Sequence, residues 1–192
     1  MHRLFDLRGK TALITGARRG IGRAISIGLA EAGANIVAVS QSFDADGASE
    51  MEEMIGQLGV RCWVRTCNVS SRDALYDLVQ WTINSAPPID ILVLNAGTIH
   101  RAAALEHSDE DWDRVRSVNL DAPFILAREF GARMVGRRHG KIIFLSSLMA
   151  FQGGINVAAY AATKGAIGQL AKDLANEWAP FGVQVNANSP LC

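Results

Sequence analysis

The chain has 192 residues, 49% of them hydrophobic and 20% charged, which is enough for one sizeable core and predicts a single domain over residues 1–192. Nineteen basic residues balance nineteen acidic ones without a segment of one sign, so neither nucleic acid nor a membrane surface is expected as a partner. No apolar run reaches the roughly 20 residues of a membrane span, and residues 1–10 lack the apolar core of a secretory signal, which predicts a cytoplasmic protein. Cys62, Cys67 and Cys192 have neither a metal-site spacing nor an even disulfide set, so no metal is expected.

Short runs rich in β-forming residues alternate along the chain with longer segments in which apolar residues recur every three or four positions. Strands are predicted at 10–15, 35–40, 60–69, 90–97, 141–147 and 183–187, and helices at 22–33, 49–59, 72–86, 109–135 and 158–182. This alternation predicts an α/β fold: a doubly wound parallel sheet with helices on both faces, in three layers.

Local signals mark several ends of these elements. Ser108 followed by Asp111 resembles a capping box before the fourth helix. Gly33 and Gly59 stand where the first two helices should stop, and Pro87–Pro88 closes the third.

The stretch TGARRGIG, residues 15–22, joins the first predicted strand to the first predicted helix. Gly16 can take the positive φ of a sharp turn, Gly20 lets the backbone approach a ligand, and Gly22 permits close contact between helix and strand. The free N–H groups where a helix begins attract a pyrophosphate. The spacing G-x-x-x-G-x-G departs from the general dinucleotide fingerprint G-x-G-x-x-G, so the motif alone is also compatible with a tight turn that binds nothing.

A second set of polar residues lies in the far half of the chain. Tyr160 and Lys164 are four residues apart and therefore share one face of the last predicted helix. A nearby ammonium favours the phenolate form of a tyrosine, which can then exchange a proton with a carbonyl or an alcohol. Ser147, at the end of the preceding strand, can donate a hydrogen bond to the same substrate oxygen.

Together with the glycine turn, these residues resemble the short-chain dehydrogenase/reductase family over nearly the whole chain, from LFDLRGKTALITG to VQVNA. The resemblance implies a Rossmann fold, NAD or NADP as cofactor, and a catalytic set of Asn119, Ser147, Tyr160 and Lys164. It implies that the cofactor contacts Gly16, Arg18, Arg19, Gly20, Ile21, Gly22, Ser40, Asn68, Val69, Asn95, Ala96, Gly97, Tyr160 and Lys164. In the family the asparagine helps to hold a water that connects the lysine to solvent. Asn119 could also simply stabilise its helix, and Asn95 could tie neighbouring strands together.

The choice between the two cofactors depends on the 2′ position of the adenosine ribose. The second predicted strand ends with Ser40 and Gln41 and offers no carboxylate for the 2′-OH of NAD. Arg19, with Arg18 beside it, stands where NADP-using relatives often keep a basic residue, so charge favours NADP, with NAD as the alternative. Asn68 replaces the aspartate that usually precedes the family's valine, here Val69; its amide oxygen can accept a weaker hydrogen bond from adenine.

The substrate is expected to be a small molecule. The strings ALEHSDEDWDRV (104–115), FQGG (151–154) and LANEWA (174–179) resemble the dehydrogenases that act on 2-deoxy-D-gluconate or 2-dehydro-3-deoxy-D-gluconate. This resemblance implies that a secondary alcohol and a ketone are interconverted on a sugar acid. Arg101 is the candidate for binding the substrate carboxylate, and Gln152 for a hydroxyl, although both could simply be solvated. A 3-oxoacyl-thioester reductase is the alternative within the same class.

The sequence departs from its relatives after the last predicted strand. Relatives read NAIAPG and continue through a substrate-covering segment and a final strand, whereas this sequence reads NANSPLC, with Asn188 and Leu191 in place of an apolar residue and a glycine. We therefore expect the family's last strand to be missing from the sheet, and a cofactor-binding protein without turnover is an alternative of another class. The helix from Ala158 to Pro180 suits pairing between subunits, so a homodimer or homotetramer is expected under each interpretation.

Overall fold

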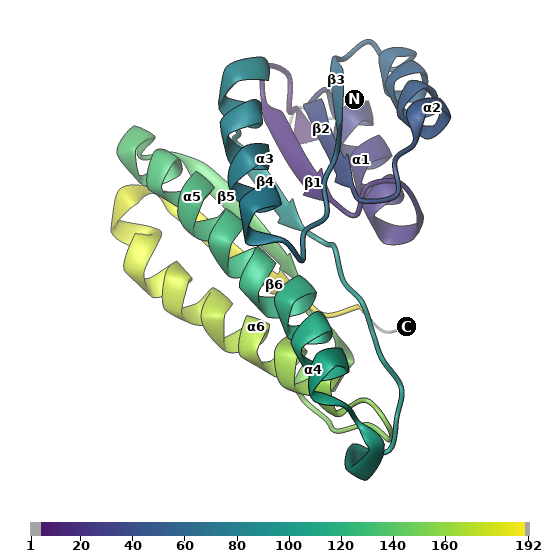
Figure 1. The fold of residues 1–192 in the computed structure, drawn as a ribbon. Helices are drawn as coiled ribbons and strands as arrows, with labels where there is room; N and C mark the ends of the chain where they lie inside the picture. Colours follow the sequence, from purple (N-terminus) through teal and green to yellow (C-terminus); the bar gives the residue numbers. More distant parts are fainter. Residues whose placement is uncertain (1–4, 191–192) are drawn as a thin grey trace.

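The computed structural model describes residues 5–190, in which six parallel strands form one sheet in the order β3-β2-β1-β4-β5-β6 (Figure 1). The strands are β1 (Thr11–Thr15), β2 (Asn35–Ser40), β3 (Cys62–Thr66), β4 (Ile91–Leu94), β5 (Gly140–Leu145) and β6 (Val183–Asn188). The chain builds outward from β1 to β3 and then returns to the other side of β1 for β4, β5 and β6. This confirms the predicted doubly wound parallel sheet, and its strand order reverses between β1 and β4.

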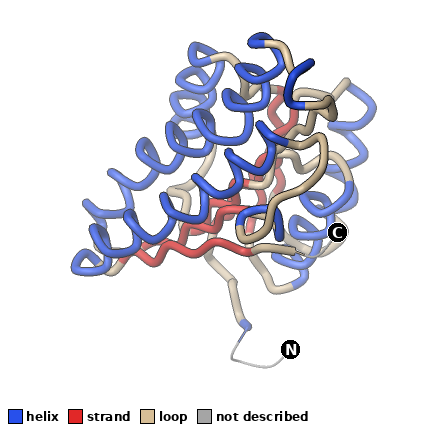
Figure 2. Tube along the Cα trace, turned by 90° about the horizontal axis from the view of Figure 1, so that it is seen from below, coloured by secondary structure: helices blue, strands red, loops and turns tan. Residues whose placement is uncertain are grey.

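Helices cover both faces of this sheet (Figure 2). They are α1 (Gly20–Glu31), α2 (Ala45–Gly56), α3 (Arg72–Ser85), α4 (Asp109–Arg116), α5 (Ala122–Arg137) and α6 (Ala158–Trp178). Short 3₁₀ turns lie at Ala104–Glu106, Leu148–Ala150 and Ala179–Phe181.

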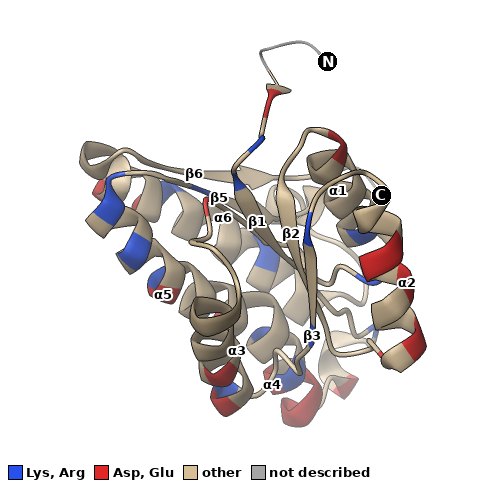
Figure 3. Ribbon diagram, turned by 90° about the horizontal axis from the view of Figure 1, so that it is seen from above, with Lys and Arg blue, Asp and Glu red and all other residues tan. Residues whose placement is uncertain are grey.

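The alternation of side chains along β1 divides the core into two layers. Leu13 packs in a cluster with residues of α3, α5 and α6, whereas Ala12 and Ile14 point to the opposite face and pack with residues of α1 and α2. All five residues of β1 are buried, as the central strand of a parallel sheet requires. Polar positions remain outside: basic and acidic residues are mixed on α4 and α5, and acidic residues dominate α2 (Figure 3).

Two observed helical regions differ from their predictions. α2 begins four residues earlier than predicted, because the Asp44 carboxylate accepts a hydrogen bond from the Gly47 N–H at 2.8 Å and caps the helix. The predicted helix 109–135 is α4 and α5 joined by a π-helical turn, Ser117–Asp121. Pro123, which has no N–H to donate, lies at the start of α5, directly after this π-helical turn.

Other predicted boundaries are confirmed. The Ser108 hydroxyl oxygen accepts a hydrogen bond from the Asp111 N–H at 3.1 Å and caps α4. Gly33 and Gly59 follow α1 and α2 with φ of +100° and +80°. Between residues 5 and 190 no helix has the length and apolar character needed to cross a membrane.

The cysteines of the described region are structural. Burial raises the pKa of the Cys62 thiol to about 12 and that of Cys67 to about 11, so both remain protonated at neutral pH. Leu191 and Cys192 lie outside the described residues.

Candidate active site

The turns after β1, β4 and β5 meet at the carboxyl edge of the sheet, where the strand order reverses. The TGARRGIG turn occupies this place after β1. Gly16 and Gly20 have φ of +69° and +56°, a conformation that glycine adopts without strain. A Cβ atom on Gly22 would overlap the Gly16 carbonyl oxygen and the Asn95 side-chain amide. Glycine at 22 therefore lets α1 begin directly against the turn.

Asn95 fastens the turn after β4 to the turn after β1. Its Nδ2 donates to the carbonyl oxygens of Thr15 at 2.9 Å and Gly16 at 3.3 Å. The Thr15 hydroxyl oxygen in turn accepts from the Asn95 N–H at 3.1 Å and the Ala96 N–H at 3.0 Å. Asn95 therefore does tie neighbouring strands together, which the sequence left open as an alternative. Its hydrogen bonds fix the turn after β1 and the turn after β4 relative to each other.

The beginning of α1 is open for an anionic ligand. Arg19 occupies the cap position without a capping hydrogen bond from its side chain, and the first turn contains no acidic residue. A Cβ atom added to Gly20 would meet nothing within 4 Å. There is therefore room for a ligand beside Gly20, and the unpaired N–H groups and the dipole of a helix start favour negative charge there.

Lys164 is buried beneath Tyr160 on α6. Its side chain is 5% exposed, and Nζ donates to the Leu145 carbonyl oxygen at 2.6 Å. Nζ lies 5.6 Å from the centre of the Tyr160 ring. Because burial disfavours the charged form, the pKa of Lys164 is lowered from 10.5 to about 8.

Ser147 follows β5 and begins the 3₁₀ turn Leu148–Ala150, where its hydroxyl oxygen accepts from the Met149 N–H at 3.2 Å. The neighbouring hydroxyl, that of Ser146, is buried and donates to the Lys164 carbonyl oxygen at 3.0 Å. Ser146 therefore holds the end of β5 against α6, while Ser147 stays at the surface of the site.

Asn119 is 1% exposed and lies in the π-helical turn between α4 and α5. Its amide makes a reciprocal pair with the main chain of Thr98: Nδ2 donates to the Thr98 carbonyl oxygen at 2.8 Å, and Oδ1 accepts from the Thr98 N–H at 2.8 Å. Nδ2 also donates to the Thr163 hydroxyl at 3.3 Å, which itself donates to the Tyr160 carbonyl oxygen at 2.9 Å. Asn119 is thus connected to α6 rather than engaged only with its own helix.

One cavity of about 520 Å³ brings most of these residues together. The sequence-predicted residues that line it are Ile21, Asn95, Gly97, Arg101, Ser147, Tyr160 and Lys164. Asn119 lies behind this lining: a Cβ atom on Gly97 would be 3.5 Å from Asn119 Oδ1 and 3.7 Å from Lys164 Nζ. Gln152 is exposed and does not line the cavity.

Sequence reasoning did not single out several residues of this site: Thr98, Met149, Ile155, Ser146 and Thr163. The last two are hydroxyl residues directly before Ser147 and Lys164, and that adjacency was the only signal for them.

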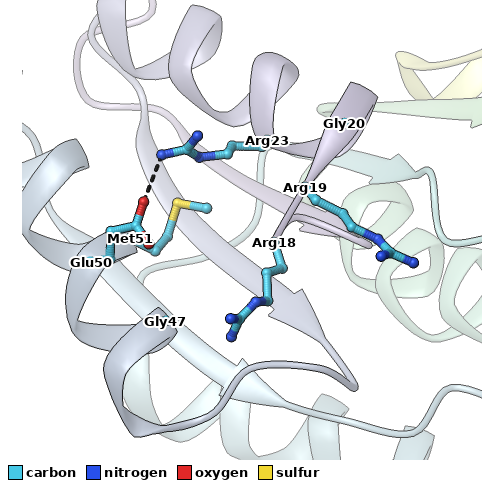
Figure 4. A pocket seen from close by; sticks show the side chains of 7 residues that line it. All are labelled: Arg18, Arg19, Gly20, Arg23, Gly47, Glu50 and Met51. Carbon is cyan, nitrogen blue, oxygen red and sulfur yellow. Dashed lines mark hydrogen bonds and ion pairs between the residues drawn. The ribbon is translucent and has the colours of Figure 1, made fainter.

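A smaller pocket of about 220 Å³ lies between the starts of α1 and α2 and is lined by three arginines (Figure 4). Arg23 points to α2, where Nη2 donates to Glu50 at 2.8 Å. The Arg18 guanidinium is held near Asp44, and its hydrogen bond lowers the pKa of that carboxyl group. The Arg19 side chain extends away from both and makes no hydrogen bond or ion pair with any of residues 5–190.

The other predicted cofactor residues follow β2 and β3. Ser40 ends β2, and its hydroxyl lies 3.1 Å from that of Ser42. Val69 is buried, whereas Asn68 is exposed and its Oδ1 already accepts from the Ser70 N–H at 3.1 Å and the Ser70 hydroxyl at 2.8 Å. These bonds make Asn68 part of a local turn as well as a candidate adenine contact.

Known proteins are similar to this chain in sequence and in fold. The chain is 55% identical over 186 residues to the 2-dehydro-3-deoxy-D-gluconate 5-dehydrogenase of Pseudoalteromonas atlantica, covering 97% of this chain and 73% of that protein. It is 35% identical over 187 residues to a 3-oxoacyl-[acyl-carrier-protein] reductase of Rickettsia felis, covering 97% and 74%. A crystal structure from Beutenbergia cavernae, described as a candidate NAD(P)-dependent gluconate 5-dehydrogenase with NADP bound at low occupancy, superposes with a TM-score of 0.91 at 41% identity, covering 97% and 73%. Residues 10–192 match the short chain dehydrogenase family, and the chain therefore belongs to this family of oxidoreductases that act on CH–OH groups.

Proposed function

We propose that this protein interconverts a secondary alcohol and a ketone on a sugar acid, with NADP as the preferred cofactor and NAD as the alternative. The observation that carries the proposal is the shared cavity, in which Ser147, Tyr160 and Lys164 face the turns that follow β1 and β4. A proton-transfer group and a dinucleotide-binding loop on the same cavity are what alcohol oxidation by a nicotinamide cofactor requires.

In this proposal Tyr160 exchanges the proton with the substrate oxygen, and Ser147 donates a hydrogen bond to that oxygen. Lys164 places its ammonium next to the Tyr160 ring, where the Leu145 carbonyl oxygen holds it, so that its positive charge lies close to the site of proton transfer. Asn119 joins Thr98 to α6 through its hydrogen bonds to the Thr98 carbonyl oxygen and the Thr163 hydroxyl. In this way it holds the helix that carries Lys164 in place.

The residues of the glycine turn fit a dinucleotide. The start of α1 offers free N–H groups and open space at Gly20, and Arg19 has a guanidinium without a partner among residues 5–190. These groups match a pyrophosphate and a ribose phosphate respectively. When bound, the nicotinamide cofactor supplies or accepts the hydride. The NADP found in the Beutenbergia structure supports this assignment.

Arg101 supports a carboxylate-bearing substrate. It follows the turn after β4, lines the same cavity as Tyr160 and Ser147, and is exposed. A guanidinium at this position can form two parallel hydrogen bonds with a carboxylate. The gluconate dehydrogenases among the relatives agree with this class of substrate.

The test is turnover of 2-dehydro-3-deoxy-D-gluconate and D-gluconate by the parent chain and by Tyr160→Phe, with NADPH and NADH binding measured in parallel. We expect the substitution to abolish turnover, while the variant still binds the cofactor through the glycine turn. Arg101→Gln should raise KM for these acids far more than it lowers kcat, and Arg101→Lys should recover part of the loss. Turnover that persists in Tyr160→Phe would refute the assigned role, and cofactor binding without any turnover in the parent would identify a binding protein instead.

A 3-oxoacyl-thioester reductase is the second candidate, because Ile155 and Met149 give the cavity an apolar wall that suits an acyl chain. The reductase from Rickettsia felis supports it. Faster turnover of acetoacetyl thioesters than of sugar acids would favour this activity.

A further inference from the structure

The segment between β4 and α4 carries Arg101 along the substrate cavity (Figure 1). Residues 95–103 of this segment form neither helix nor strand. The position of the arginine therefore depends on side-chain contacts and on single main-chain hydrogen bonds, because no continuous helix or sheet ladder holds it.

Neighbouring residues of this segment face opposite sides. Ile99 and Arg101 line the cavity, whereas the side chain of His100 contacts α4. Such alternation is the property of an extended chain, in which successive side chains point in opposite directions. A contact that fixes His100 against α4 therefore also keeps Arg101 directed to the cavity.

The His100 imidazole lies between two side chains of α4. Its Nε2 is 3.3 Å from Asp111 Oδ2, and its Nδ1 is 3.3 Å from Arg114 Nη2. A guanidinium only donates, so Nδ1 is the acceptor of this pair, and Nε2 carries the proton that is donated to the carboxylate. A neutral imidazole satisfies both contacts at once.

The two partners of His100 are themselves held in place. Asp111 Oδ1 accepts from Arg114 Nη2 at 2.5 Å, and Asp111 Oδ2 accepts from the Ser108 hydroxyl at 3.0 Å. Ser108 caps α4, so this network belongs to the beginning of a helix. The His107 ring packs against the His100 ring edge to face, with 5.2 Å between the ring centres. His100 is therefore bound to a fixed part of the fold.

A second contact holds the segment on the other side of Arg101. The Ala102 N–H donates to the Asn156 carbonyl oxygen at 3.2 Å, in the loop that carries Ile155 along the same cavity. Asn156 has a φ of +60°, a left-handed conformation that asparagine tolerates better than most residues. Arg101 thus lies between two anchored positions, His100 and Ala102.

Arg101 is also the cation of the cavity that remains free for a ligand. Arg101 and Lys164 are the charged side chains among the described residues that line the cavity, and Lys164 is engaged with the Leu145 carbonyl. The Arg101 guanidinium makes no hydrogen bond or ion pair with any residue from 5 to 190. Its neighbours in the chain, and no partner of its own, therefore determine where this guanidinium lies.

We propose that His100, bound between Asp111 and Arg114, is a positioning residue that holds Arg101 ready for the substrate carboxylate. The inference rests on the proposed function, which assigns that carboxylate to Arg101. His100 acts through Arg101 and does not contact the substrate. An arginine that is already held at the cavity loses less conformational freedom on binding than one on an unanchored segment.

The experiment is steady-state kinetics of the full chain with 2-dehydro-3-deoxy-D-gluconate and D-gluconate as substrates and NADP as acceptor. We expect His100→Ala to raise KM by about fivefold, with kcat within about twofold of the parent value. His100→Gln should keep KM close to that of the parent, because its amide has an acceptor and a donor on neighbouring atoms, as the neutral imidazole has.

A double-mutant cycle separates this role from a purely structural one. If His100 acts through Arg101, His100→Ala should change KM by less than about twofold in a chain that already carries Arg101→Gln. The same fivefold rise in both backgrounds would show that His100 acts independently of Arg101 and would overturn the inference. Arg114→Met leaves the contact with Asp111 and should give a smaller rise in KM than His100→Ala, which provides a second test if His100→Ala does not fold.

His139→Ala is the matched control. His139 is another exposed histidine beside an aspartate, with Nε2 3.6 Å from Asp90 Oδ1, and it does not line the cavity. Its substitution should leave KM and kcat unchanged. Thermal unfolding of every variant shows whether a change in KM comes from a folded protein.

The remaining outcomes are separable. A parent without turnover of either sugar acid refutes the proposed function and this inference with it. Turnover by the parent with an unchanged KM in Arg101→Gln refutes the assignment of the carboxylate to Arg101. A raised KM in Arg101→Gln together with an unchanged KM in His100→Ala refutes the inference alone.

Discussion

The free energy that the fold loses by burying the Lys164 ammonium in the candidate site can be measured from the pH dependence of stability. Its pKa in the folded protein is about 8, against an ordinary value of 10.5, because its ammonium is buried. Between these two values the unfolded chain binds more protons than the folded one, so the free energy of unfolding should rise with pH across this window and stay level below about pH 8. The difference between 10.5 and about 8 corresponds to about 3 kcal/mol of folding free energy over the whole window.

The assay is urea denaturation of the parent and of Lys164→Met from pH 7 to pH 10.5. The variant lacks the hydrogen bond to Leu145 at every pH. The buried charge is therefore reported only by how the difference in unfolding free energy between parent and variant changes with pH. The stability of the parent should gain on that of the variant by about 3 kcal/mol between the two ends of the window. Lys172→Met, on the exposed side of the same helix, should keep the pH dependence of the parent. A parent-to-variant difference that is flat from pH 7 to pH 10.5 would refute the reasoning.

Three further substitutions test the contacts around the site. Gly22→Ala should destabilise the fold by about 1–3 kcal/mol and abolish cofactor binding, because its methyl group has no room against the turn after β1; Gly28→Ala, with open space around it, should be neutral or stabilising in the same urea titration. Thr163→Val should lower the free energy of unfolding by about 1–3 kcal/mol, because it leaves buried partners, including the Asn119 amide, without a hydroxyl. Thr163→Ser keeps the hydroxyl and should retain both stability and kcat; equal losses in the two variants would show that the hydroxyl is unimportant. Ser108→Ala should lower the unfolding free energy by about 1 kcal/mol through loss of the α4 cap, and a change below the error of denaturation would contradict that assignment.

The parallel sheet and its helices could be predicted because they depend on periodic burial, which the sequence displays directly. Short-range exceptions could not be predicted in the same way. The first turn of α2 contains Gly47 and little apolar pattern, so periodicity places the start of the helix too late. The reason for that glycine is the guanidinium of Arg18, a residue 29 positions earlier whose position relative to α2 only the folded chain reveals.

In the candidate site, too, some features could be predicted from the sequence and others could not. Tyr160 and Lys164 could be placed on one face from their spacing, and Ser147 could be added from its position at the end of the preceding strand. The family resemblance added Asn119. The contact of Asn119 with Thr98 depends on a π-helical turn inside a segment whose apolar pattern is that of one long helix. Such a turn changes the direction of a side chain without changing the average period, so the sequence pattern does not record it.

The end of β5 and the beginning of α6 are joined by two hydrogen bonds that run in opposite directions. Lys164 donates through its side chain to the main chain of Leu145, and Ser146 donates through its side chain to the main chain of Lys164. The end of β5 and the beginning of α6 cannot separate locally without breaking both hydrogen bonds and exposing the buried Lys164 side chain to water. Amide hydrogen exchange near Lys164 should therefore require the cooperative opening of strand and helix together. In the proposed reaction, the groups assigned to the substrate are consequently ordered before it arrives, and little reorganisation is left for the reaction itself.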